Sequence, residues 1–193
     1  MVRIRYNSPV VLTFALLALV LLPLNTFSGG WLNTHLLSVY RCSLLDPLAY
    51  VRFFCHVLGH ANLKHYMNNM LLFLLVGPAL EEKYGSSLLL KCIAFTALAT
   101  GLVEFIFFPG YALLGASGVV FMMIVFSSFT AVERGTIPVT MILVVALYLG
   151  AEIVSGFSGS DNISQLAHIV GGVCGMFFGF AVSGAKRGHS RRH

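Results

Sequence analysis

The chain has 193 residues, of which 58% are hydrophobic and only 10% are Asp, Glu, Lys or Arg. Soluble domains average about 25% charged residues, so this composition excludes a soluble globular domain. It also excludes a nucleic-acid-binding domain, in spite of the formal net charge of +5. A membrane-spanning helix needs about 20 apolar residues, and the length therefore allows one transmembrane domain, residues 1–193, with about six spans.

Six apolar runs are separated by Pro, Gly and charged residues, and each run predicts a transmembrane helix because a bilayer offers backbone amides no water. The predicted spans are Pro9–Thr26, Leu63–Leu80, Leu88–Phe108, Leu114–Val132, Pro138–Val154 and Ile163–Ser183. The predicted fold class is an all-α membrane protein, a bundle of six transmembrane helices. A secretory signal peptide is the competing interpretation of the first run, but no Ala-x-Ala cleavage site follows it.

The basic residues predict the orientation, because Lys and Arg accumulate on the cytoplasmic side of membrane proteins. With both termini in the cytoplasm, nine basic residues lie inside: Arg3, Arg5, Lys83, Lys91, Arg134, Lys186, Arg187, Arg191 and Arg192. Three lie outside: Arg41, Arg52 and Lys64. We therefore expect cytoplasmic termini, an outer loop at about 27–62, and a short basic tail at 184–193 that contacts anionic lipid headgroups.

Four cysteines are present. Cys92 and Cys174 fall within predicted spans, where a role in apolar packing is expected. Cys42 and Cys55 share the outer loop, and whether they form a disulfide stays open because nothing in their spacing demands it.

Polar residues cluster where the second predicted span begins. His65 and Asn69 are four residues apart, which places them on one face of a helix, and His56 and His60 have the same spacing. Ionisable groups inside spans are rare and point to function by default. The alternative for each histidine is a hydrogen bond to a neighbouring helix.

A serine between small residues opens the fourth predicted span, in the run Gly115-Ala116-Ser117-Gly118. The glycines keep bulk away from the hydroxyl, and a helix N-terminus offers unpaired N–H groups of the kind that an oxyanion needs. Ser158 lies in a similar Gly-x-Ser-Gly run, 156–159, but within a polar stretch typical of a loop. Ser117 is therefore the better candidate for a nucleophile.

His168 lies early in the sixth predicted span. Three glycines follow it on one face: Gly171, Gly175 and Gly179. Glycines let a second helix approach closely, and if that helix is the fourth span, His168 reaches Ser117. His65, Ser117 and His168 all fall in the outer parts of the second, fourth and sixth spans, so we expect them at a common depth.

Four motifs in order resemble the rhomboid family of intramembrane serine proteases: His60-x4-His65-x3-Asn69, Glu81-x-x-x-Gly85, Gly115-Ala116-Ser117-Gly118 and His168-x-x-Gly171-x-x-x-Gly175. The match runs from about Arg52 to Gly179. The resemblance implies a bacterial, six-span, multi-pass protein of the cell membrane. It implies cleavage of transmembrane protein substrates near the extracytoplasmic face, with no cofactor and no metal.

The resemblance also implies roles for single residues. Ser117 attacks the peptide carbonyl, and His168 acts as general base and then as general acid. The oxyanion is bound by the side chains of His65 and Asn69 and by backbone N–H groups of Ala116 and Ser117. The implied supporting residues are His60 beside the oxyanion site, Arg52 as a tether of the outer loop, Phe121 where the family often has a Tyr stacked on the histidine, and Gly115, Gly118, Gly171 and Gly175 at close approaches.

No Asp lies in a span near either motif, so we expect a dyad. Glu104 and Glu152 are expected to hydrogen-bond locally or to reach the membrane surface.

Three rival interpretations remain. A catalytically silent rhomboid-like protein would bind membrane partners without cleavage, although such a protein is expected to lose the serine or the histidine. A metal site built from His60, His65 and His168 lacks the Glu of the His-Glu-x-x-His pattern. A transporter is disfavoured because the chain shows no inverted repeat and no charged pair at mid-span.

Overall fold

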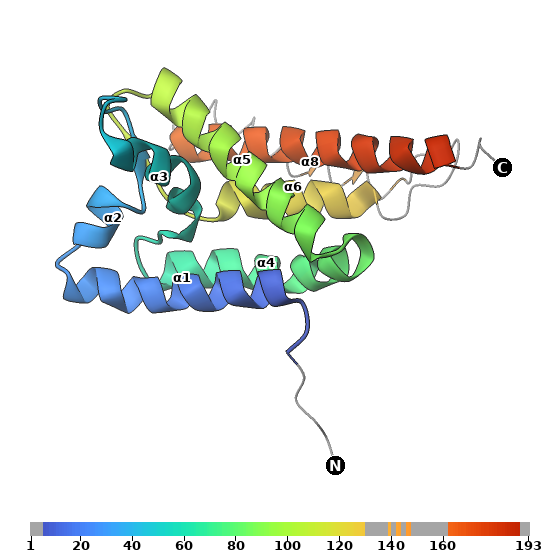
Figure 1. The fold of residues 1–193 in the computed structure, drawn as a ribbon, viewed down its shortest axis with the longest axis horizontal. Helices are drawn as coiled ribbons and strands as arrows, with labels where there is room; N and C mark the ends of the chain where they lie inside the picture. Colours follow the sequence, from blue (N-terminus) through green and yellow to red (C-terminus); the bar gives the residue numbers. More distant parts are fainter. Residues whose placement is uncertain (1–5, 130–138, 140–141, 144–145, 148–161, 190–193) are drawn as a thin grey trace, which may run out of the picture.

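The structure of the chain is a computed structural model, which describes residues 6–129 and 162–189 together with 139, 142, 143, 146 and 147 (Figure 1). Most of the described chain is helical. The helices are α1 (Pro9–Phe27), α2 (Trp31–His35), α3 (Pro47–Cys55), a 3-10 turn η1 (His56–Leu58), α4 (Leu63–Tyr84), α5 (Ser86–Phe107), α6 (Ser117–Ser128) and α8 (Asn162–His189). Two short strands, β1 (Val39–Tyr40) and β2 (Ala112–Leu113), pair antiparallel.

Three of the described helices are long and apolar enough to cross a membrane: α1, α5 and the part of α8 from Gln165 to Ser183. The predicted span Leu63–Leu80 corresponds to α4, whose first turns carry polar residues such as Lys64 and Asn69. The predicted span Leu114–Val132 corresponds to α6, which has 12 residues as described. The protein is therefore a mostly helical membrane protein, and the count of six spans stays a prediction.

The fifth predicted span, Pro138–Val154, lies largely outside the described residues. Five of its residues are described, all of them helical and exposed: Val139, Ile142, Leu143, Ala146 and Leu147.

The predicted boundary between the second and third spans is wrong. The charged run that begins at Glu81 was expected to break the chain, but α4 continues through it to Tyr84. The break is Gly85 alone, whose φ of 85° is open to glycine at little cost. The helix can continue because Glu81 is only 4% exposed and its carboxylate is hydrogen-bonded inside the protein.

Glu81 fixes the start of α1. Its two carboxylate oxygens accept hydrogen bonds from the backbone N–H groups of Val10 (2.9 Å) and Val11 (3.0 Å). The Ser86 hydroxyl donates a third hydrogen bond of 2.7 Å. The N-cap residue Ser8 makes no side-chain cap of its own, so a carboxylate from another helix satisfies N–H groups that α1 would otherwise leave unpaired.

The connection between α1 and α4 is ordered by short elements and by one buried cation. Arg52 on α3 is 3% exposed and donates hydrogen bonds to the carbonyl of His35 (2.8 Å) and to the carboxylate of Asp46 (2.9 Å). Its guanidinium also lies 4.7 Å from the ring centroid of Tyr40. Strand β1 then joins this connection to the segment before α6, through the pair Val39 and Leu113.

The cysteines are unpaired. Cys42 and Cys55, for which a disulfide was left open, are both free thiols, as are Cys92 and Cys174. The Cys42 sulfur instead accepts a contact of 3.4 Å from Arg52.

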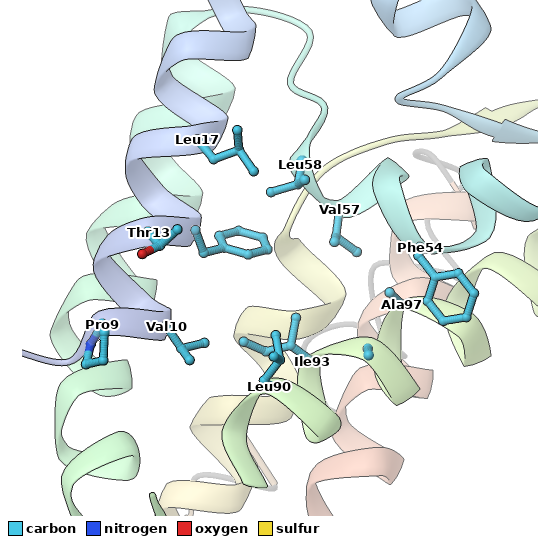
Figure 2. Close-up of a pocket in the computed structure, with 12 residues that line it drawn as sticks. Pro9, Val10, Thr13, Leu17, Phe54, Val57, Leu58, Leu90, Ile93 and Ala97 are labelled. Atoms are coloured by element: carbon cyan, nitrogen blue, oxygen red, sulfur yellow. The ribbon is translucent and has the colours of Figure 1, made fainter. Parts of the chain in front are cut away.

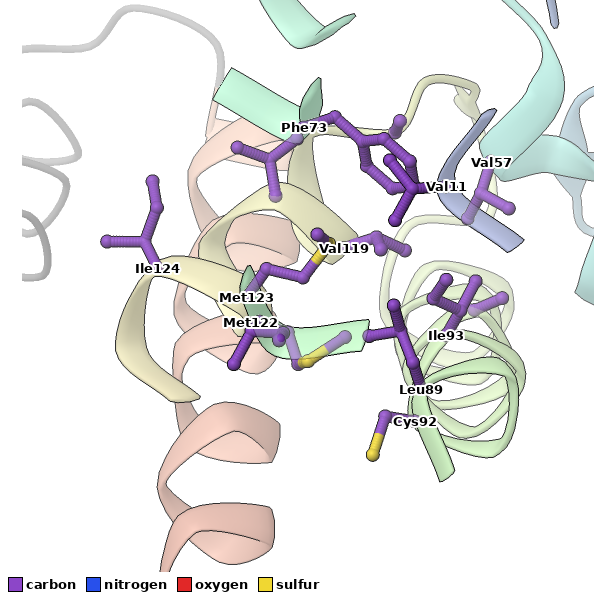
Figure 3. Packing of buried hydrophobic residues seen from close by; sticks show 14 of the residues in the cluster. Val11, Val57, Phe73, Leu89, Cys92, Ile93, Val119, Met122, Met123 and Ile124 are labelled. Atoms are coloured by element: carbon purple, nitrogen blue, oxygen red, sulfur yellow. The ribbon is translucent and has the colours of Figure 1, made fainter. Parts of the chain in front are cut away.

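The helices α4, α6 and α8 begin at the same end of the molecule, where α2 and α3 also lie, and they run toward the opposite end (Figure 1). Between them and α5 lies a core of buried apolar side chains that includes Phe73, Leu89, Val119 and Met122 (Figure 3). This arrangement brings the first turns of three helices, distant in sequence, to one region.

Candidate active site

The close approach of α6 and α8 depends on glycine. A Cβ on Gly171 would overlap the carbonyl oxygen of Gly118, and one on Gly175 would overlap the carbonyl oxygen of Met122. A Cβ on Gly179 would overlap the ring of Phe129. The two helices are therefore in backbone contact at Gly171 and Gly175, and at Gly179 the missing side chain leaves room for the Phe129 ring.

Ser117 is the first residue of α6. The preceding turn is set by Gly115, whose φ of 122° favours glycine, and by a hydrogen bond of 2.9 Å from the Gly115 N–H to the carbonyl of His56. Ser117 therefore follows a turn that is held by η1 and opens a helix, with the backbone N–H groups of Ala116 and Ser117 at the helix N-terminus.

His65 and Asn69 extend from α4 toward that turn. A Cβ on Gly115 would lie 2.7 Å from His65 Nε2 and 3.7 Å from Asn69 Nδ2. Asn69 is 6% exposed, and its Nδ2 has no hydrogen-bond partner among the described residues. Two nitrogen atoms of α4 thus face the backbone just before Ser117.

His60, in the loop before α4, packs against His65. Its ring meets the rings of His65 and Tyr66 edge to face, with centroids 5.1 Å and 5.5 Å apart. Its Nδ1 lies 3.2 Å from the carbonyl of Leu58. Burial, and secondarily the neighbouring His65, lowers the pKa of His60 to about 4, so this imidazole is neutral at physiological pH.

His168 lies on α8 beside the first turns of α6. Its ring stacks on Phe121, with centroids 4.3 Å apart and planes 4° from parallel. Phe121 is one helical turn beyond Ser117, on the same face of α6. The carbonyl of Ala167, next to His168, would lie 3.1 Å from a Cβ on Gly118.

The structure therefore gathers most of the sequence candidates in one region and leaves others elsewhere. Ser117, His65, Asn69, His60 and His168 surround the turn before α6 and its first helical turn. Arg52 lies in the α1–α4 connection, which is the predicted outer loop, and contacts His35 and Asp46 there.

Of the remaining candidates Glu104, Glu152 and Ser158, the structure describes only Glu104. Ser158 and Glu152 lie outside the described residues. Glu104 is 2% exposed within α5, which excludes the alternative of reaching the membrane surface and leaves that of a local hydrogen bond. Within the described part of the chain, no group of three or more His, Cys, Asp and Glu side chains is placed to hold a metal ion.

His56 also shapes this region, although its sequence pattern assigns it no role there. The carbonyl of His56 holds the Gly115 N–H, and its buried ring lies 3.0 Å from the carbonyl of Ala97 through Nε2. The spacing of His56 and His60 singled out this residue, but no local pattern indicates a backbone contact across 59 positions.

Comparisons with known proteins identify the family of the chain. The family model described as the Rhomboid domain matches residues 47–185. The rhomboid protease GluP of Bacillus subtilis (strain 168) is 30% identical over 191 residues, covering 94% of this chain and 36% of GluP. Rhomboid-related protein 2 of Mus musculus is 30% identical over 143 residues, covering 68% of this chain and 47% of that protein.

Rhomboid-related protein 1 of Caenorhabditis elegans is 29% identical over 140 residues, covering 68% of this chain and 39% of that protein. The chain thus spans less than half the length of each of these relatives. Since the family model covers well over half of the chain and GluP matches nearly all of it, the protein belongs to the rhomboid family of integral membrane proteins.

Proposed function

We propose that the protein is an intramembrane serine endopeptidase that uses Ser117 and His168 to cut transmembrane substrates near the extracytoplasmic face of the membrane. The observation that carries this proposal is the convergence of α4, α6 and α8. Ser117 opens α6, His65 and Asn69 face the turn before it, and His168 stacks one turn further along the same helix.

In the proposed reaction, Ser117 Oγ attacks the scissile carbonyl and gives its proton to the His168 imidazole. The imidazolium then protonates the leaving amine, and water hydrolyses the acyl-enzyme by the reverse proton path. A serine hydroxyl is a weak nucleophile at neutral pH and needs such a base. A positioned base contributes about 10²–10⁴-fold in rate.

The oxyanion of the tetrahedral intermediate would be bound by N–H donors of His65, Asn69 and the backbone at Ala116 and Ser117. Asn69 supports this role because its buried Nδ2 donates to no described residue, and a buried donor without an acceptor costs about 1–3 kcal/mol. A single donor of this kind contributes about 10²–10³-fold in kcat. In this proposal the intermediate supplies the acceptor that the resting protein lacks.

The orientation and location belong to the same proposal. We place both termini in the cytoplasm, because nine of the twelve Lys and Arg residues then lie inside. The shared starting end of α4, α6 and α8 (Figure 1) then faces outward. The likeness to the GluP protease of a bacterium supports a multi-pass protein of a bacterial plasma membrane, with six spans.

Labelling with a fluorophosphonate probe in detergent tests the proposal, because the probe reacts with activated serines. We expect the parent protein and Ser158→Ala to be labelled and Ser117→Ala and His168→Ala to remain unlabelled. Labelling of Ser117→Ala would overturn the assignment of the nucleophile. An unlabelled parent that also cleaves no transmembrane substrate would favour the rival, a rhomboid-like protein that binds partners without cutting them.

A further inference from the structure

An apolar cavity lies on the side of the molecule away from the α6–α8 interface. It has a volume of about 450 Å³ and lies between α1, α5 and the segment formed by α3 and η1 (Figure 2). Phe14 and Leu17 of α1 face it from one side, and Ile93 and Ala94 of α5 line the other. Val57 of η1 also lines it. We call this space the α1–α5 cavity.

The walls of the α1–α5 cavity are almost entirely hydrocarbon. Thr13 is the one residue with a polar side chain among the residues that line it. A water molecule needs two to four polar partners to occupy a cavity, and these walls do not provide them. The occupant must therefore be apolar, or the cavity stays empty and its lining loses dispersion contacts.

The mouth of the cavity opens where membrane lipid is expected. Both long walls, α1 and α5, are helices apolar and long enough to span a membrane. The side chains at the rim are well exposed on the protein surface, with Leu17 at 45%, Phe54 at 46% and Leu90 at 55%. Since the protein is an integral membrane protein, lipid hydrocarbon surrounds these faces and is the most abundant apolar molecule at the opening.

The volume fits one hydrocarbon chain. An apolar cavity of about 150 Å³ accepts benzene, which has six carbon atoms. At the same density, the α1–α5 cavity of about 450 Å³ accepts on the order of 18 carbon atoms, which is the size of one phospholipid acyl chain. We propose that the α1–α5 cavity binds one acyl chain of a bilayer phospholipid.

The bound chain would also support the candidate active site, and this step rests on the proposed function. Val57, which lines the cavity, follows His56 directly, and the His56 carbonyl accepts the Gly115 N–H just before Ser117. Ala97 also lines the cavity, and its carbonyl oxygen lies 3.0 Å from Nε2 of the His56 ring. An acyl chain that packs against Val57 and Ala97 therefore restrains the two residues next to His56: its neighbour in the chain and the residue whose carbonyl contacts its ring.

Filling the cavity with protein tests the binding step. Leu17→Trp and Ala94→Phe add rings at the cavity, whereas Leu19→Trp adds the same ring as the first variant at a comparably exposed position of α1, 42% exposed, that does not line it. The probe is dioleoyl phosphatidylglycerol, titrated onto the full chain in detergent and counted by native mass spectrometry. Thermal unfolding without lipid checks that each variant folds.

We expect the parent, Leu19→Trp and the inactive Ser117→Ala to retain one phospholipid per chain. Leu17→Trp and Ala94→Phe should bind it at least about tenfold more weakly, because the apolar surface that the chain would cover is already buried. Equal binding by all the variants, or no saturable binding by the parent, overturns the proposal. Normal lipid binding by the filled variants together with lost substrate cleavage also overturns it, in favour of a substrate side chain in the cavity.

The two proposals fail separately. Lipid binding by Ser117→Ala is independent of catalysis. A parent protein that binds one chain but shows neither serine labelling nor substrate cleavage would contradict the proposed protease and leave the lipid site standing. A link to the active site predicts in addition that fluorophosphonate labelling of the parent rises several-fold on lipid addition and that labelling of Leu17→Trp does not respond. Equal responses of both proteins would refute the link.

Discussion

The α6–α8 interface and the α1–α5 cavity show opposite ways of packing helices in one small membrane protein. At the interface, backbone meets backbone, and a single added carbon at Gly171 would overlap a carbonyl oxygen of Gly118. At the cavity, two helices of spanning length leave about 450 Å³ between them, lined by side chains such as Phe14 and Ile93. Both regions are apolar, so polarity does not explain the difference.

The two regions differ in how precisely they must position their side chains. In the proposed reaction the reacting groups must be positioned to within a fraction of an ångström. Direct backbone contact between α6 and α8 would hold Ser117 and His168 in place without intervening rotamers. No such demand applies between α1 and α5. There Glu81 holds the first turn of α1, and the cavity extends from that turn to Leu17.

The largest effect is expected from Gly171→Ala. The new Cβ would overlap the Gly118 carbonyl, so the helices must separate at a cost of about 3 kcal/mol, the upper range for overpacking. The free energy of unfolding in a detergent denaturation and the rate of fluorophosphonate labelling should both fall. Gly110→Ala is the matched control, because a Cβ there has nothing within 4 Å, and a near-normal Gly171→Ala would show that the interface is not close-packed.

The next effect concerns pH and His60, which packs beside the candidate active site. The pKa of His60 is lowered to about 4 by burial and by His65, against about 6.5 in an unfolded chain. Between these values the unfolded state binds more protons, so stability rises with pH. The contribution is complete above about pH 6.5 and is lost as pH falls toward 4, by up to about 3 kcal/mol.

Unfolding free energies of the parent and of His60→Gln, measured between about pH 8 and about pH 5, check this expectation. The variant should lose stability less steeply on acidification, because its amide does not titrate. The same slope in both proteins would mean that His60 is solvated and not buried against His65.

A smaller effect is expected at the start of α1, one wall of the cavity, and it tests whether Glu81 anchors that end of the helix. In Glu81→Gln the neutral amide keeps one acceptor oxygen, so one of the N–H groups of Val10 and Val11 loses its acceptor and the other loses a charged one. The loss should be about 1.5–3 kcal/mol of unfolding free energy. Glu82→Gln, exposed on the same helix, should stay within about 0.5 kcal/mol of the parent, and equal losses in both variants would argue against this anchor.

The sequence predicts local features of this fold well and long-range contacts poorly. The bounds of α1 and α5 agree with the predicted spans to within two residues at each end, because Pro, Gly and charge mark helix ends locally. The end of α4 was misplaced because the charged run at Glu81 is used inside the protein rather than in water. A carboxylate that caps a helix 70 residues away leaves no local signal.

The candidate site divides in the same way. The glycine spacing after His168 indicated a close helix partner, and the structure places α6 there. The hydrogen bond from Gly115 to His56 and the pairing of Val39 with Leu113 depend on the tertiary fold and have no counterpart in the sequence pattern. The α1–α5 cavity is likewise a property of how helices meet.

The smallest expected effect tests whether the α6–α8 interface also orients the proposed base. Phe121 lies parallel to the His168 ring at 4.3 Å, and such an aromatic pair contributes about 0.5–1.5 kcal/mol beyond its buried area. Phe121→Leu keeps an apolar side chain but loses the stacking, so labelling of Ser117 should slow by about 2- to 12-fold with little change in unfolding free energy. Phe121→Tyr, which keeps the ring, should label at close to the parent rate. If leucine and tyrosine label equally fast, backbone contact alone positions His168, and the interface would need no side chain to align the dyad.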